Sequence, residues 1–116
     1  MAEVRKLLNV DEIEPLIESS HQKPVLIFKH SLSCPISSRA YHEYQRYLDE
    51  RPQDDDDVVH TLIEIQNARP VSNAVAETTG VRHESPQALL IRDGKVVWHD
   101  SHHRIRVDSL NQAVSD

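Results

Sequence analysis

The segment 25–42 constrains the fold most, because a short apolar run leads there through a polar turn into a helical pattern. Val25 to Phe28 are β-branched, leucine or aromatic, which is typical of a strand buried on both faces of a sheet. Pro35 favours the first turn of a helix, since its fixed φ is already helical and its missing N–H would have no intrahelical partner there. Cys34, the single cysteine, therefore lies between the end of a strand and the start of a helix.

The position of Cys34 predicts a reactive thiolate. Unpaired N–H groups and the positive end of the helix dipole favour an anion at a helix N-terminus. Cysteines at such positions have pKa values of roughly 3.5 to 7.5, against about 8.5 for a free cysteine. The alternative is that Cys34 is a small buried hydrophobe, as many free cysteines are.

Ser37 stands three residues after Cys34, where a redox dithiol would carry its second sulfur. With one cysteine in the chain, no intramolecular disulfide can form. We expect the Ser37 hydroxyl, one helical turn away, to donate a hydrogen bond to the thiolate.

The rest of the chain alternates between strand-like and helix-like stretches. We expect strands at 4–10 (or an entry loop there), 25–28, 58–65, 88–92 and 95–99, and helices at 11–20, 35–51, 67–80 and 108–114. Asp11, with Glu14 three residues on, is the expected cap of the first helix, and Asn67 that of the third.

The Asp93-Gly94 pair is a hairpin signal between two strand-like runs, so the strands at 88–92 and 95–99 should pair antiparallel. The order β, α, β, α, β, α, β, β, α then predicts an α/β fold with a mixed central sheet flanked by helices on both faces. We expect one domain over residues 1–116.

Charge and composition exclude several functions. A net charge of -6 with no basic stripe argues against nucleic acid as the main partner. One cysteine excludes a disulfide framework and favours a reducing cytosol. No run of 18 apolar residues or signal-like N-terminus is present, so we expect a cytoplasmic protein without a membrane partner. The acidic run 53–57 should be a solvated loop.

Two short blocks resemble a known family. Residues 28–31, Phe-Lys-His-Ser, followed by 34–37, Cys-Pro-Ile-Ser, are similar to the monothiol bacilliredoxins, also called YtxJ-like general stress proteins, which have a thioredoxin fold. The likeness extends through residues 94–99 and 101–102.

The resemblance implies a thiol–disulfide oxidoreductase that removes bacillithiol, a low-molecular-weight thiol, from mixed disulfides on other proteins. Its catalytic residues would be Cys34 as nucleophile with Pro35 and Ser37, and bacillithiol would be a co-substrate without any other cofactor. In this fold the proline matching Pro86 is cis and faces the cysteine, which leaves the backbone of Ser85 free to pair with a bound chain.

Lys29 and His30 complete the expected substrate-binding set. At the end of the strand they would add positive charge near the sulfur. Alternatively, Lys29 is a solvated charge and His30 a turn residue bonded to the backbone.

Two other functions stay open. His99, His102 and His103 lie close together in sequence and, with Cys34, would be candidate ligands of a metal or cluster, although no standard zinc spacing is present. The chain would otherwise be a redox-inactive interaction module. Arg39, Arg82 and the histidines near His102 are candidate anion contacts or simply solvated charges. The sequence does not identify the small thiol, the target proteins, the reductant or the oligomeric state.

Overall fold

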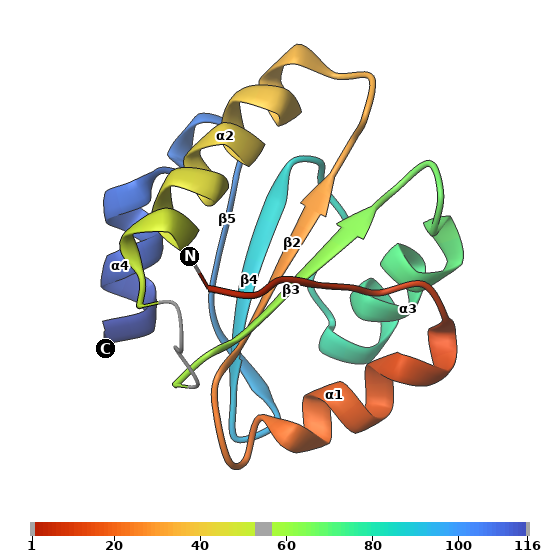
Figure 1. The fold of residues 1–116 in the computed structure, drawn as a ribbon. Helices are drawn as coiled ribbons and strands as arrows, with labels where there is room; N and C mark the ends of the chain where they lie inside the picture. Colours follow the sequence, from red (N-terminus) through yellow and green to blue (C-terminus); the bar gives the residue numbers. More distant parts are fainter. Residues whose placement is uncertain (1, 53–56, 116) are drawn as a thin grey trace.

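The computed structural model describes residues 2–52 and 57–115, and its centre is a mixed five-stranded sheet (Figure 1). The strand order is β1-β3-β2-β4-β5. The strands are β1 (Arg5–Lys6), β2 (Val25–His30), β3 (Val59–Glu64), β4 (Gln87–Arg92) and β5 (Lys95–Ser101). β1, β2 and β3 run parallel, whereas β4 is antiparallel to both β2 and β5. The α/β fold and the mixed sheet are therefore as predicted.

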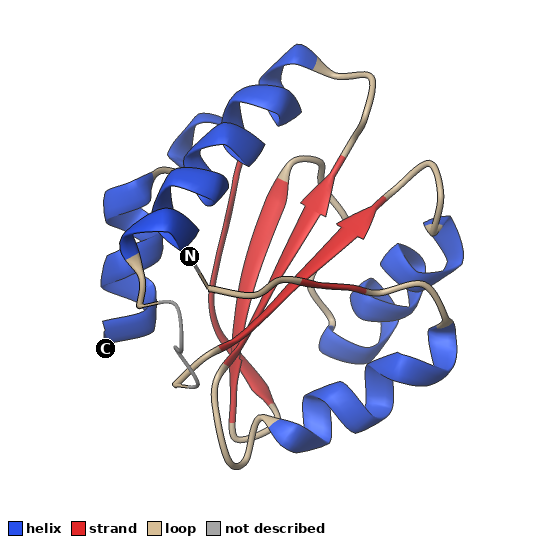
Figure 2. Ribbon diagram, viewed as in Figure 1, coloured by secondary structure: helices blue, strands red, loops and turns tan. Residues whose placement is uncertain are grey.

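Helices cover both faces of the sheet (Figure 2). The helices are α1 (Ile13–Ser19), α2 (Pro35–Glu50), α3 (Arg69–Thr79) and α4 (Val107–Ser115), with short 3-10 turns η1 (Val10–Glu12) and η2 (His102–Arg104). α2 and α4 pack together on one face, and α1 and α3 pack on the other (Figure 1). Among the helices of the described residues, none is long and apolar enough to cross a membrane.

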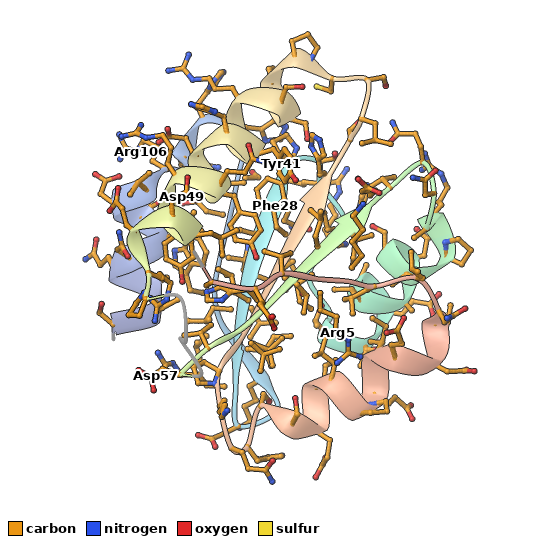
Figure 3. The ribbon with its side chains drawn as sticks, viewed as in Figure 1. Arg5, Phe28, Tyr41, Asp49, Asp57 and Arg106 are labelled. Atoms are coloured by element: carbon orange, nitrogen blue, oxygen red, sulfur yellow. The ribbon has the colours of Figure 1, made fainter. Side chains whose placement is uncertain are left out.

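The apolar run of β2 supplies both halves of the core, because alternate residues of a strand point to opposite faces. Leu26 and Phe28 belong to the cluster that includes Tyr44 and Leu110 from α2 and α4, whereas Ile27 belongs to the cluster on the α1 and α3 side. Figure 3 shows Phe28 beside Tyr41 of α2, with ring centroids 6.1 Å apart. This two-sided burial explains the absence of polar residues from 25–28.

Two predicted helix caps are wrong. The first helical segment begins with η1, and the Glu12 carboxylate accepts hydrogen bonds from the N–H groups of Leu8 and Asn9, both at 2.9 Å, which lower the pKa of Glu12. The capping pair is therefore Asn9 and Glu12, two residues before the expected Asp11 and Glu14. It lies there because the chain turns soon after β1 ends. The prediction could not place that turn, since β1 is only two residues long.

The cap of α3 is Ala68 and not Asn67. The Ala68 N–H bonds to the Glu64 carbonyl at 3.0 Å, so the turn after β3 takes one more residue than the sequence pattern suggested. The predicted stop at Gly80 is confirmed, with φ of 75° at the helix C-cap.

The hairpin between β4 and β5 is confirmed. Asp93 and Gly94 have φ of 52° and 78°, the left-handed conformations that a tight two-residue hairpin turn requires. The predicted acidic loop lies almost entirely outside the described residues.

Candidate active site

Cys34 is the N-cap of α2, as its sequence context predicts. Its backbone is extended, with φ of -106° and ψ of 122°, and Pro35 opens the helix. The Cys34 carbonyl accepts the first helical bond, from Ser38 N–H at 3.0 Å. Cys34 is half-buried, so the sulfur is neither sealed in the core nor fully solvated. A thiol here is open to a partner and adjoins the unpaired amides of the first helical turn.

Ser37 is fully buried and fixes the turn from within. Its Oγ accepts a hydrogen bond from Ser31 N–H at 2.8 Å and lies 2.7 Å from His30 Nδ1. These contacts join the end of β2 to the first turn of α2. The expected bond from Ser37 to the sulfur is not among the contacts of the described residues, where the Ser37 hydroxyl contacts Ser31 and His30 instead.

Gln66 holds the same turn from outside, and the sequence analysis missed it. From the loop between β3 and α3, its Oε1 accepts from Leu32 N–H at 2.9 Å, and its Nε2 donates to the hydroxyls of Ser31 and Ser33 at 2.9 and 3.2 Å. The only available signal was its position after a strand, which places it at the same sheet edge as the end of β2. Together, Ser37 and Gln66 bond to both sides of the segment that leads into Cys34.

His30 lies on the α2 face of the sheet, where burial favours its neutral form. Its ring stacks on Tyr41 at a centroid distance of 4.5 Å, and it is buried. Burial lowers the pKa of His30 below 6.5, and Glu64 opposes that effect. His30 therefore supplies a hydrogen-bond partner for Ser37 rather than a permanent positive charge.

Lys29 has its side chain on the opposite face of the sheet, beneath α3. Its side chain is fully buried, and Nζ donates to the Ser72 carbonyl of α3 at 3.1 Å and lies 3.4 Å from His83 Nδ1. Burial lowers the pKa of Lys29 to about 8. The alternative of a solvated strand-end charge is thus wrong. The ammonium group points toward α3, whereas Cys34 lies at the start of α2 on the other face.

Pro86 enters β4 next to the end of β2, and the Ser85–Pro86 bond is cis, as the resemblance implied. The Pro86 carbonyl accepts a hydrogen bond from His102 N–H at 3.2 Å, which ties this loop to η2. Ser85 Oγ is buried without a hydrogen-bond partner among the described residues. The loop therefore lies at the same edge of the sheet as the candidate cysteine.

The histidines considered as metal ligands separate in space. His99 lines a hollow with Ile17 and Thr78, whereas His102 and His103 line another beside α2. Within residues 2–52 and 57–115, no three His, Cys, Asp or Glu side chains gather closely enough to hold a metal ion.

Solved structures similar to this chain share its fold. One, described as a candidate oxidoreductase with a thioredoxin fold, is 39% identical, with 95% of this chain and 92% of that chain covered and a TM-score of 0.80. Thioredoxin f from spinach chloroplast in its short form is 16% identical over 98% of this chain and 92% of that chain, with a TM-score of 0.71. A thioredoxin from Malassezia sympodialis is 14% identical, with 99% of this chain and 90% of that chain covered and a TM-score of 0.75.

The family is shown by a match to most of the sequence. The model of the monothiol bacilliredoxin BrxC matches residues 5–110, which include the whole strand, turn and helix around Cys34 as well as the Pro86 loop. With its thioredoxin fold and its lone cysteine at a helix N-cap, this chain belongs to the monothiol bacilliredoxin BrxC family of thiol oxidoreductases.

Proposed function

We propose that this protein removes bacillithiol from S-bacillithiolated proteins through Cys34. The observation that carries the proposal is a single half-buried cysteine at the N-cap of α2, with a serine in place of a second sulfur. A lone thiol accepts a small thiol from a mixed disulfide and cannot then close a disulfide within its own chain. The proposal places the reaction in a reducing cytosol, where proteins keep their thiols free.

The reaction is one exchange followed by a second. The Cys34 thiolate attacks the bacillithiol sulfur of the mixed disulfide, so that a Cys34–bacillithiol disulfide forms as the original disulfide breaks, and the target leaves as a thiolate that takes up a proton. A second low-molecular-weight thiol then loses its proton and attacks the Cys34–bacillithiol disulfide. That step releases a small-molecule disulfide and restores the Cys34 thiolate. No further cofactor takes part.

The surrounding residues hold the nucleophile in place. Backbone amides of the first turn of α2 stabilise negative charge at the sulfur. Ser37, His30 and Gln66 fix the turn through the contacts described above, which limits the positions that the sulfur can take. The backbone of Ser85 is the proposed contact for the extended backbone of the target protein.

The proposal is tested with a bacillithiolated protein as substrate and released protein thiol as the readout. Wild type should release the thiol, and both Cys34→Ala and Cys34→Ser should release it only at the rate without enzyme. Ser38→Ala is the matched control, because Ser38 lies on the same helical turn with an exposed side chain. Equal release by wild type and Cys34→Ala would overturn the proposal and favour the redox-inactive interaction module.

A further inference from the structure

A hollow of about 280 Å³ opens between the beginning of α2 and the turn η2. Its lining includes Ile36, Arg39 and Glu43 from α2 and His102, His103 and Arg106 from the segment between β5 and α4. Both histidines and both of these arginines are exposed. We call this hollow the cationic pocket.

The lining of the cationic pocket begins two residues after Cys34. Ile36 and Arg39 follow the cysteine by two and five residues, which corresponds to about 3 and 7.5 Å along a helix axis. Long side chains on a helix lean toward its N-terminus, so Arg39 leans toward the cysteine end. On the other side, His102 has φ of 56° and its N–H is bonded to the Pro86 carbonyl. The lining residues therefore belong to two segments that are attached to the candidate active site, the first turns of α2 after Cys34 and the η2 turn bonded to Pro86.

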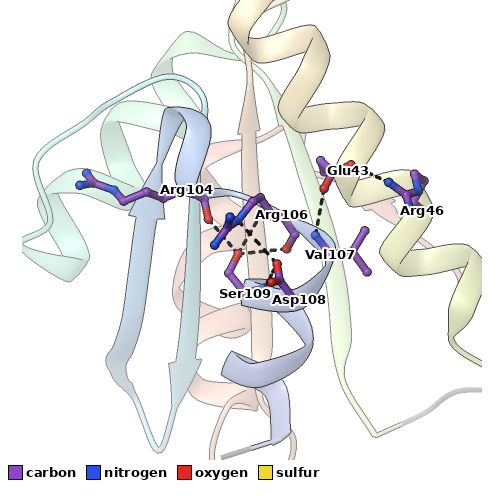
Figure 4. A network of polar contacts seen from close by, with 7 residues as sticks. All are labelled: Glu43, Arg46, Arg104, Arg106, Val107, Asp108 and Ser109. Carbon is purple, nitrogen blue, oxygen red and sulfur yellow. Dashed lines mark hydrogen bonds and ion pairs between the residues drawn. The ribbon is translucent and has the colours of Figure 1, made fainter.

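The charge of the cationic pocket is opposite to that of the protein. Its lining holds three arginines and one glutamate, a formal charge of +2 with neutral histidines, whereas the whole chain carries -6. Figure 4 shows that Glu43 is already engaged: one oxygen accepts from Arg46 at 3.0 Å and the other from Val107 N–H at 3.2 Å. The glutamate therefore neutralises Arg46 and leaves the other two arginines to the pocket.

Those two arginines are available to a ligand. Among the described residues, the Arg106 guanidinium pairs with one carboxylate, that of the exposed Asp108 at 3.6 Å (Figure 4). Arg39 has no carboxylate partner among the described residues. Guanidinium groups bind carboxylates in a two-pronged geometry, which is why arginine is preferred where a carboxylate must be held in a fixed orientation.

We propose that the cationic pocket binds the carboxylates of the small thiol while the thiol's sulfur is joined to Cys34. This inference rests on the proposed function, and it identifies the malate portion of bacillithiol as the group that Arg39 and Arg106 contact. The size of the pocket favours this occupant, because about 280 Å³ is just below the range of roughly 300 to 1,000 Å³ for drug-sized ligands and suits one portion of a small molecule, whereas an acidic protein segment would need a longer groove.

The test compares two forms of one target protein: one carries bacillithiol, and the other carries cysteinyl-glucosamine, which has the same sulfur and sugar without malate. Wild type, Arg39→Gln, Arg106→Gln and Arg104→Gln are assayed for kcat/KM of thiol release. Arg104 is the matched control, because it is an exposed arginine of the same segment that is paired with Asp100 at 2.6 Å and lies outside the pocket.

We expect Arg39→Gln and Arg106→Gln each to lower kcat/KM about tenfold or more for the bacillithiol form and to leave the malate-free form unchanged, with Arg104→Gln at the wild-type value for both. Free malate should inhibit wild type competitively and Arg39→Gln more weakly. Equal losses on both forms, or no loss on either, would overturn the pocket assignment while the proposed function stands. If wild type releases no thiol from either form, the proposed function fails first.

Discussion

Replacing Lys29 by methionine tests the cost of a buried ammonium group. Methionine keeps the apolar stem in the core and removes the charge. Because burial lowers the pKa of Lys29 from 10.5 to about 8, the charged form costs about 3 kcal/mol in the folded state. The variant loses the bond to the Ser72 carbonyl, worth about 1 to 2 kcal/mol. We therefore expect Lys29→Met to be about 1 to 2 kcal/mol more stable than wild type at pH 7.

The difference in stability between wild type and Lys29→Met should depend on pH. Between about pH 8 and pH 10.5 the unfolded chain still holds the Lys29 proton and the folded chain has lost it, so wild-type stability rises with pH relative to the variant. The advantage of Lys29→Met should shrink by about 3 kcal/mol across that window, and it should reverse sign near the middle of the window, at about pH 9.

Urea unfolding at pH 7, 8, 9 and 10 measures this difference, with the exposed Lys95→Met as control. The control should differ from wild type by a small and constant amount. A Lys29→Met variant that is less stable than wild type at pH 7, with a difference that does not change with pH, would show that the ammonium group is solvated and would refute the reasoning.

Three further predictions concern the turn, a helix end and acid stability. Ser37→Ala should cost about 1 to 3 kcal/mol in urea unfolding, because Ser31 N–H loses its buried acceptor; an unchanged midpoint would contradict the contact. Gly80→Ala should cost about 1 kcal/mol from its φ of 75° alone, since no atom lies within 4 Å of the added Cβ; a neutral result would show that the helix end shifts. Burial lowers the pKa of His30 and of His83 below 6.5, so stability should fall as pH drops below about 6.5; thermal unfolding from pH 7.5 to 5.5 checks this, and a flat profile would argue against buried neutral rings.

The sequence predicts those features that follow from local rules. The strand from Val25, the Cys34–Pro35 helix start, the Asp93-Gly94 hairpin and the end of α3 at Gly80 each depend on residues within a few positions of one another. The family resemblance added the cis bond before Pro86, which position alone would not have indicated.

Features that depend on tertiary structure were not predictable. The sequence favours a charge at a strand end for Lys29, but the sheet directs its side chain beneath α3, where it contacts the Ser72 carbonyl and His83. Gln66 reaches the turn before Cys34 from a loop more than 30 residues away in sequence. Helical spacing predicts a bond from Ser37 to the sulfur, because both lie on one helical turn, yet the Ser37 hydroxyl contacts His30 and Ser31 at the end of β2.

Intact-protein mass spectrometry of both reaction partners tests the central claim most directly. After the protein is mixed with a bacillithiolated target and the exchange is stopped with acid, the account predicts that one bacillithiol leaves the target for each one that appears on this chain, attached at Cys34. A target that loses bacillithiol while Cys34 stays unmodified, in a reaction that contains no second thiol, would contradict it.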